Sequence, residues 1–123
     1  ETLPQVLSIR VDESLLFTNS RWISETLTSA LRQRPQLRHV VLMMSGVNGI
    51  DLTGLEVLMQ LDRELRAKGI QLHLSELKGP LRDALDRTEA SDWLSGQIFM
   101  TQDAAFNTLA AEIAQQDAGK NKS

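Results

Sequence analysis

The chain contains no cysteine, only 4% aromatic residues and three prolines among its 123 residues. The absence of cysteine excludes disulfides and thiolate metal sites, and it fits a reducing compartment. The only histidines, His39 and His73, are far apart in the sequence and lack the spacing of a metal-ligand pair. We therefore expect neither a disulfide framework nor a metal site.

An excess of basic charge is also missing, because 13 basic residues face 16 acidic ones and the net charge is -3. Without a positive field, nucleic acid is not an expected partner. No apolar run approaches the roughly 20 residues that a membrane helix needs, and the first residues, "ETLPQV", contain neither a basic leader nor an apolar signal segment. The sequence predicts a soluble piece, and the missing initiator Met suggests a fragment or a processed product.

The length and the 41% hydrophobic content fit one α/β domain. Five segments have the pattern of strands: 6–11, 15–17, 37–44, 70–74 and 97–100. The short link between the first two predicts an antiparallel hairpin. The nearly continuous apolar run of the third is typical of a central strand covered on both faces, and the fourth is expected to lie parallel to it.

Four segments have the 3.6-residue period of amphipathic helices, with starts predicted at Asn19, Thr53, Pro80 and Thr101. We expect Pro35 to stop the first of them, and the second to end at Gly69. The last should pack through Phe106, Leu109, Ala110 and Ile113. Together the segments predict a mixed sheet of four or five strands covered by about four helices, in a domain of residues 1–116 with a flexible polar tail at 117–123.

The stretch "GVNGIDLTG", residues 46–54, follows the central strand, and the carboxyl end of such a strand is the usual place for a site in an α/β sheet. Thr53 and Glu56 have the spacing of a capping box, and Asp51 would interact favourably with the helix dipole, so local chemistry explains the stretch as a helix start. The sharper hypothesis is that the Thr53 hydroxyl accepts a phosphoryl group, which would add about 1.5 to 2 negative charges beside Asp51.

The string "GIDLTGLEVLMQLDRELRAKGIQLHLSELKGPLRDAL" resembles the signature region of the STAS domain, which is shared by anti-sigma-factor antagonists and the cytoplasmic tails of SulP-type anion transporters. Asp51, Thr53 and Gly54 match its Asp-x-Ser/Thr-Gly motif. The resemblance covers roughly residues 5–113 and implies the STAS fold. The stretches "LLFTN", "LKGPLRDALDRT" and "IFMTQDAAF" look like the transporter tails, which favours that branch.

The resemblance implies a non-catalytic regulatory and interaction domain of a sulfate or other anion transporter, at the cytoplasmic face of the bacterial inner membrane. Its expected partner is the membrane-spanning portion of the parent transporter, and a cytoplasmic protein or a nucleotide is a further candidate. The candidate contact area comprises Asn48, Asp51, Thr53 and Gly54. Thr53 matches the phosphorylated position of the antagonists, although Leu52 departs from their Asp-Ser-Ser-Gly pattern.

The sequence leaves two other functions to consider, an anti-sigma-factor antagonist and an enzyme. A freestanding anti-sigma-factor antagonist, switched by phosphorylation at Thr53, is the alternative. An enzyme has little support, because no cysteine or nearby histidine can activate a nucleophile and Asp51 with Thr53 lacks a third group. We expect no cofactor, since Gly46 and Gly49 lack the phosphate-loop pattern.

Several remaining side chains have structural interpretations. We expect Trp22 to cover the edge of the core and Trp93 to anchor a loop. His39 and His73 are interpreted as surface or cross-strand residues. The basic group is interpreted as a solvated helix end, with binding to anionic lipid headgroups as the alternative; it comprises Arg32, Arg34 and Arg38.

Overall fold

The computed structural model describes residues 4–12, 20–49 and 52–121. Its elements follow one another as β1 (Val6–Asp12), α2 (Ser20–Gln33), β2 (His39–Gly46), α3 (Leu52–Ala67), β3 (Gln71–Ser75), α4 (Gly79–Arg87), α5 (Ala90–Trp93), β4 (Ile98–Phe99) and α6 (Gln102–Asn121). The predicted α/β class is confirmed. None of the helices in these ranges is long and apolar enough to cross a membrane.

The four strands form one sheet in the order β1-β2-β3-β4. All three pairings are parallel, and β2 and β3 lie in the middle, as expected for the apolar run at 37–44 and its parallel neighbour. The short strand predicted near residues 97–100 is confirmed as the edge strand β4. The antiparallel strand predicted at 15–17 and the cap at Asn19 lie outside the described residues.

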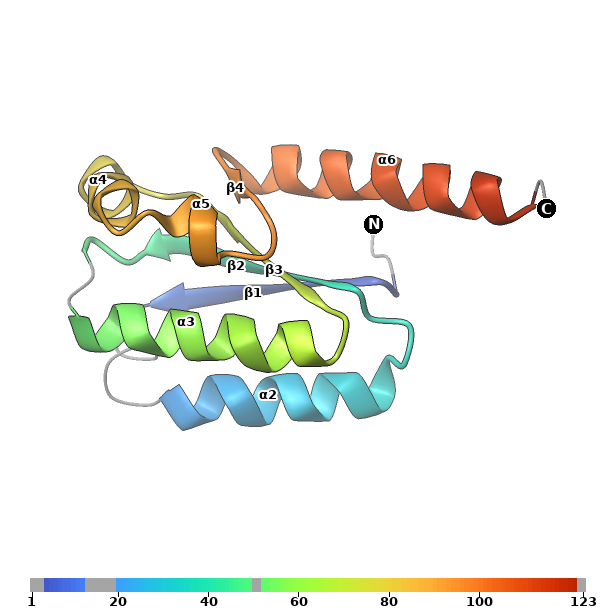
Figure 1. Cartoon of the computed structure of the whole chain (residues 1–123), viewed down its shortest axis with the longest axis horizontal. Helices are drawn as coiled ribbons and strands as arrows, with labels where there is room; N and C mark the ends of the chain where they lie inside the picture. Colours follow the sequence, from blue (N-terminus) through green and yellow to red (C-terminus); the bar gives the residue numbers. More distant parts are fainter. Residues whose placement is uncertain (1–3, 13–19, 50–51, 122–123) are drawn as a thin grey trace.

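Helices cover both faces of the sheet (Figure 1), with α2 and α3 on one face and α6 on the other. The alternation of side chains along β2 explains this arrangement, because Leu42 packs in the cluster under α2 and α3 while Val41 packs under α6. The larger cluster also takes in α4 and α5 through Leu81, Leu85 and Ala90. The smaller one contains only Val6, Val41, Phe99, Ala105, Leu109 and Ile113.

The helix ends follow local chemistry. Gly69 has a φ of 76°, the left-handed conformation that ends α3 as predicted. Pro80 lies in the first turn of α4. The Thr101 hydroxyl oxygen accepts a hydrogen bond from the Ala104 backbone N–H at 3.0 Å, so its predicted role as the cap of α6 is confirmed. Helix α6 continues to Asn121, beyond the predicted domain boundary at 116.

The predicted capping box is wrong in its position. Helix α3 begins at Leu52, so Thr53 is the second residue of the helix and not the residue before its first turn. The residue before Leu52, Asp51, lies outside the described residues. Thr53 therefore sits inside the first turn, with its side chain exposed.

Candidate functional site

The loops that follow β2 and β3 meet at the carboxyl edge of the sheet. After β2, Val47 is buried and its backbone N–H donates to the Met44 carbonyl at 3.0 Å, which turns the chain back toward the core. Asn48 is exposed, and its side-chain oxygen accepts a hydrogen bond from the Lys78 ammonium at 2.8 Å. Because Lys78 directly precedes α4, this bond ties the two loops together at the edge where α/β sheets usually place a site.

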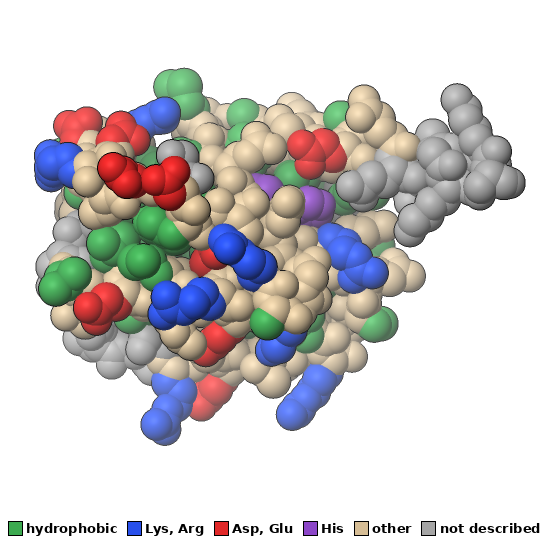
Figure 2. Space-filling model, viewed as in Figure 1, with side chains coloured by type: hydrophobic (Ala, Val, Ile, Leu, Met, Phe, Trp, Pro, Cys, Tyr) green, Lys and Arg blue, Asp and Glu red, His purple; other side chains and the backbone are tan. Residues whose placement is uncertain are grey.

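The start of α3 is the second part of this region. Leu52 is 70% exposed, an unusual position for a large apolar side chain, and Thr53 beside it is also exposed. Hydrophobic surface gathers between α4 and the start of α3 (Figure 2). Gly54 is buried. Of the four predicted contact residues, Asn48 and Thr53 reach solvent, Gly54 does not, and Asp51 lies outside the described residues.

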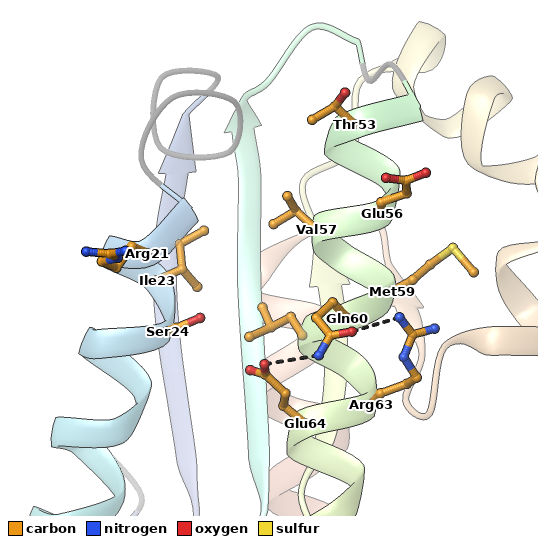
Figure 3. Close-up of a pocket in the computed structure, with 11 residues that line it drawn as sticks. Arg21, Ile23, Ser24, Thr53, Glu56, Val57, Met59, Gln60, Arg63 and Glu64 are labelled. Atoms are coloured by element: carbon orange, nitrogen blue, oxygen red, sulfur yellow. Dashed lines mark hydrogen bonds between the residues drawn. The ribbon is translucent and has the colours of Figure 1, made fainter.

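A groove runs between α2 and α3, and Thr53 lies at one end of it (Figure 3). It has a volume of about 770 Å³ and an apolar floor that includes Ile23, Val57 and Leu61. Its rim is polar, with the neutral amide of Gln60 among side chains of both charges, Arg21, Glu56, Arg63 and Glu64.

Part of that rim is ordered by hydrogen bonds along α3. The Arg63 guanidinium donates to the Gln60 side-chain oxygen at 2.8 Å, and the Gln60 amide donates to the Glu64 carboxylate at 3.2 Å. These exposed pairs each contribute a few tenths of a kcal/mol to the helix, roughly 0.2 to 0.5. An apolar floor inside a polar rim is the pattern of a contact surface for another molecule.

The two histidines lie together, although the sequence separates them by more than 30 positions. The His39 Nδ1 and His73 Nε2 atoms are 3.0 Å apart, and both side chains are buried, with 5% and 0% exposed. The cross-strand interpretation is therefore confirmed and the surface interpretation is wrong. Burial lowers the pKa of His73 to about 4, helped by the nearby His39, and burial also lowers the pKa of His39.

Sequence reasoning missed Asp62, a carboxylate inside the apolar stripe of α3. Its side chain is 1% exposed. One oxygen accepts hydrogen bonds from the Ser95 backbone N–H at 2.8 Å and the Ser95 hydroxyl at 2.7 Å, and the other accepts from the Arg66 guanidinium at 2.8 Å. A charged residue on an apolar stripe, with an arginine four positions later, is the sequence signal that points to such a buried pair.

Three earlier interpretations concern side chains near the surface. The Arg34 guanidinium donates to the Val6 carbonyl at 3.3 Å and that of Arg38 to the Leu37 carbonyl at 3.0 Å, so both are engaged at the end of α2 and the start of β2. Trp93 is half-buried against the larger core cluster, but it is the last residue of α5 and not part of a loop as predicted. The Trp22 side chain is not among those described.

The fold and the site define a small α/β domain with one parallel sheet, whose candidate site is the exposed helix start after a central strand. A family model for the STAS domain matches residues 1–105, and the chain belongs to the STAS domain family.

The proteins that are similar to this chain include several named sulfate transporters. The chain is 29% identical to Sulfate transporter 1.1 of Arabidopsis thaliana, over 93% of this chain and 19% of that protein. It is 28% identical to High affinity sulfate transporter 2 of Stylosanthes hamata, over 93% of this chain and 18% of that protein. The chain thus spans about a fifth of the length of these relatives.

Solved structures support the same fold. A sulfate transporter family protein from Wolinella succinogenes has a TM-score of 0.67 and 22% identity, over 91% of this chain and 93% of that one. The structure of SLC26A9 has a TM-score of 0.66 and 18% identity, over 91% of this chain and 21% of that one. At these identities the likeness concerns the fold.

Proposed function

We propose that this chain is a non-catalytic regulatory domain of a SulP-type transporter of sulfate or another anion, acting at the cytoplasmic face of the membrane. The observation that carries the proposal is the match of 93% of this chain to about a fifth of proteins named sulfate transporters. A domain of this kind acts on transport through contacts with the rest of the transporter. Its expected partner is therefore the membrane-spanning portion of the parent.

The contact surface in this proposal is the start of α3, with Asn48, Asp51, Thr53 and Gly54 as its centre. The exposed Leu52 supports the choice, because a partner that covered this side chain would gain about 1.5 to 3 kcal/mol from its burial. The apolar floor of the neighbouring groove supports it as well. A cytoplasmic protein or a nucleotide is the further candidate for the same surface.

Phosphorylation of Thr53 is the regulatory step in this proposal. The hydroxyl is exposed in the first turn of α3, where a negative group is favoured by the helix dipole. Glu56 lines the same groove and would repel it. A phosphoryl group would therefore change both the charge and the local contacts of the surface that meets the partner.

The test compares variants of the parent transporter in membrane vesicles. Thr53→Glu adds the negative charge and Thr53→Val removes the hydroxyl with little change in shape. Thr28→Glu is the matched control, because Thr28 is also an exposed helical threonine but lies on α2 and bonds only to the Ser24 carbonyl in its own helix. We expect Thr53→Glu to change anion uptake per inserted transporter and Thr28→Glu to leave it unchanged. Equal uptake in the three variants and the parent would contradict the proposal.

The freestanding antagonist remains the second candidate, and the exposed Thr53 hydroxyl at the family motif is the observation in its favour. It predicts that a serine-kinase anti-sigma factor with ATP labels Thr53. Mass spectrometry of the product identifies the labelled residue, and Thr53→Val should remain unlabelled. An unlabelled wild-type chain that never binds the kinase would eliminate this candidate.

A further inference from the structure

The buried histidine pair forms one hydrogen-bonded chain with the segment that leads into β4. The Gln97 backbone N–H donates to His73 Nδ1 at 3.0 Å, and His73 Nε2 lies 3.0 Å from His39 Nδ1. A neutral imidazole has one donor and one acceptor nitrogen. Since His73 Nδ1 accepts, its proton is on Nε2, which donates to His39 Nδ1. His39 therefore carries its own proton on Nε2.

This order leaves no place for an additional proton. A proton on His73 Nδ1 would face the Gln97 N–H, donor against donor. A proton on His39 Nδ1 would face the donating N–H of His73 in the same way. Protonating either ring therefore breaks one hydrogen bond of the chain. It also places a charge in a buried site, where only a narrow strip of histidine surface reaches the exterior (purple in Figure 2).

The pair is placed where it can control α6. Phe99 of β4 lies against the His73 ring, with the ring centroids 5.7 Å apart, and belongs to the small cluster that holds α6 on the sheet. The Gln97 side chain donates to the Glu112 carboxylate of α6 at 3.4 Å. A further link is Gln102, which accepts from the Ser75 hydroxyl at 2.9 Å and donates to Ser8 at 2.6 Å.

The 95–97 segment cannot adjust freely if its bond to His73 is lost. Gly96 packs so closely on β3 that a Cβ there would overlap the Leu72 carbonyl and the His73 ring. Its backbone N–H donates to the Leu72 carbonyl at 3.0 Å. A shift of the His73 ring is therefore transmitted to the backbone that precedes β4 and α6.

We propose that His39, His73 and the Gln97 N–H form a proton-sensitive latch, which holds β4 and α6 against the sheet and releases them when either ring takes up a proton. This inference concerns α6 and does not depend on the proposed function of the α3 surface. The apolar contact to be broken is small, because the described side chains of α6 contribute three members to its cluster, Ala105, Leu109 and Ile113.

The charged groups around the pair work in opposite directions. Glu112, from α6, favours a proton on His39, whereas Arg38, from the segment before β2, disfavours it. His39, on β2, disfavours a charge on the His73 ring of β3. The other two strands contribute uncharged side chains to this cluster, Val6 of β1 and Phe99 of β4. Burial is the largest influence on both rings and lowers the pKa of each.

Amide hydrogen exchange of the 123-residue chain tests the latch. When α6 opens locally, His73 should regain an ordinary pKa of about 6.5 from its buried value of about 4. Lowering the pH from 7.5 to 5.0 should then raise the opening constant of α6 about 25-fold. This value applies after the exchange rates are corrected for the intrinsic exchange rate. The opening constant of the α6 amides should be larger than that of the α3 amides. Low concentrations of denaturant should leave the α6 opening constant unchanged. The variant with both His39→Asn and His73→Asn keeps acceptors at the two Nδ1 positions and should lose the acid response.

Two outcomes of this experiment would overturn the latch. One is an α6 opening constant that does not change with pH, or that responds equally in the double variant. The other is exchange of α6 only together with α3, which would show that α6 does not open on its own.

A second measurement needs no variant. Because the chain has only two histidines, nitrogen NMR of the imidazole rings gives two resolvable ring systems. At neutral pH both should carry their proton on Nε2, and His73 should titrate near pH 4. A proton on Nδ1 of either ring, or titration of His73 near pH 6.5, would contradict the proposal.

Discussion

The face of the sheet under α2 and α3 differs from the face under α6 in what it buries. The first is apolar, with Leu42 and Met44 of β2 and Leu72 and Leu74 of β3 packed in one large cluster. On the second, the alternate positions of β3 hold His73 and Ser75, both fully buried and hydrogen-bonded. The stabilisation from burying apolar area does not depend on the orientation of the groups. A buried polar network, in contrast, stabilises one geometry and fails when a hydrogen-bond partner is lost.

This difference assigns separate roles to the two faces. The α2 and α3 face supplies most of the stability, and it holds the start of α3 rigidly at the carboxyl edge of the sheet. The α6 face has a small apolar cluster, so its attachment depends on specific hydrogen bonds and responds to conditions that alter them. Variants that alter one face and leave the other unchanged should separate these roles.

The largest effect is expected from truncating a leucine side chain in the larger core cluster. Leu58→Ala should lower the free energy of unfolding by about 2 to 5 kcal/mol, because the side chain is fully buried and its truncation leaves a cavity in the core. Leu109→Ala makes the same change on the α6 face and should cost less, about 2 kcal/mol, since one helix over a small cluster can readjust. Urea unfolding of both variants measures the difference. A larger cost for Leu109→Ala would contradict the unequal roles of the faces.

Acid should weaken the chain through the histidine pair. His73 has a pKa near 4 in the folded state and about 6.5 when unfolded, so between these values the unfolded chain binds a proton that the folded chain does not. The free energy of unfolding is therefore unaffected above pH 7 and falls as the pH is lowered from 6.5 to 4, by about 3 kcal/mol in total.

Urea titrations at a series of pH values measure this change, and the variant with both His39→Asn and His73→Asn separates it from the titration of carboxylates. We expect the double variant to retain only the carboxylate part. An identical pH dependence in both proteins would show that the pair has no influence on stability.

Asp62 provides a polar contact within the apolar face. Asp62→Ala leaves the Ser95 backbone N–H and hydroxyl without their acceptor and should cost about 1 to 3 kcal/mol. The Ser95 hydroxyl also accepts from the Leu72 N–H at 3.0 Å, so exchange at the start of β3 should increase. Glu64→Ala on the exposed side of α3 is the control, with an expected change within about 0.5 kcal/mol. Equal costs for the two variants would contradict the structural role of Asp62.

The sequence predicted the strands of the central sheet and the helix periods, because apolar alternation is a local signal. It did not predict contacts that only strand register creates. His39 pairs with Gln71 and Val41 with His73, so the two rings meet diagonally across β2 and β3, which spacing along the chain cannot reveal. Asp62 was missed for a related reason, since its partner Ser95 is 33 positions away.

At the candidate site, the motif located the helix start but not the exact first residue. The capping-box spacing predicted Thr53 as the cap, but local chemistry alone does not fix the first residue of a helix. The exposure of Leu52 and the burial of Gly54 depend on how α3 rests on the sheet, which is a tertiary property.

The smallest effect comes from two threonines near helix starts on the two faces, Thr53 in the first turn of α3 and Thr101 at the cap of α6. Thr101→Ala removes the hydroxyl that accepts from the Ala104 N–H and should cost about 1 kcal/mol. Thr53→Ala should change the free energy of unfolding by no more than about 0.5 kcal/mol, because Thr53 is exposed and lies within the first turn, where alanine is at least as favourable. Thermal and urea unfolding of the two single variants measure both values. A cost for Thr53→Ala equal to that of Thr101→Ala would restore Thr53 as the cap of α3, with its hydroxyl engaged by the backbone and less available to a phosphoryl donor.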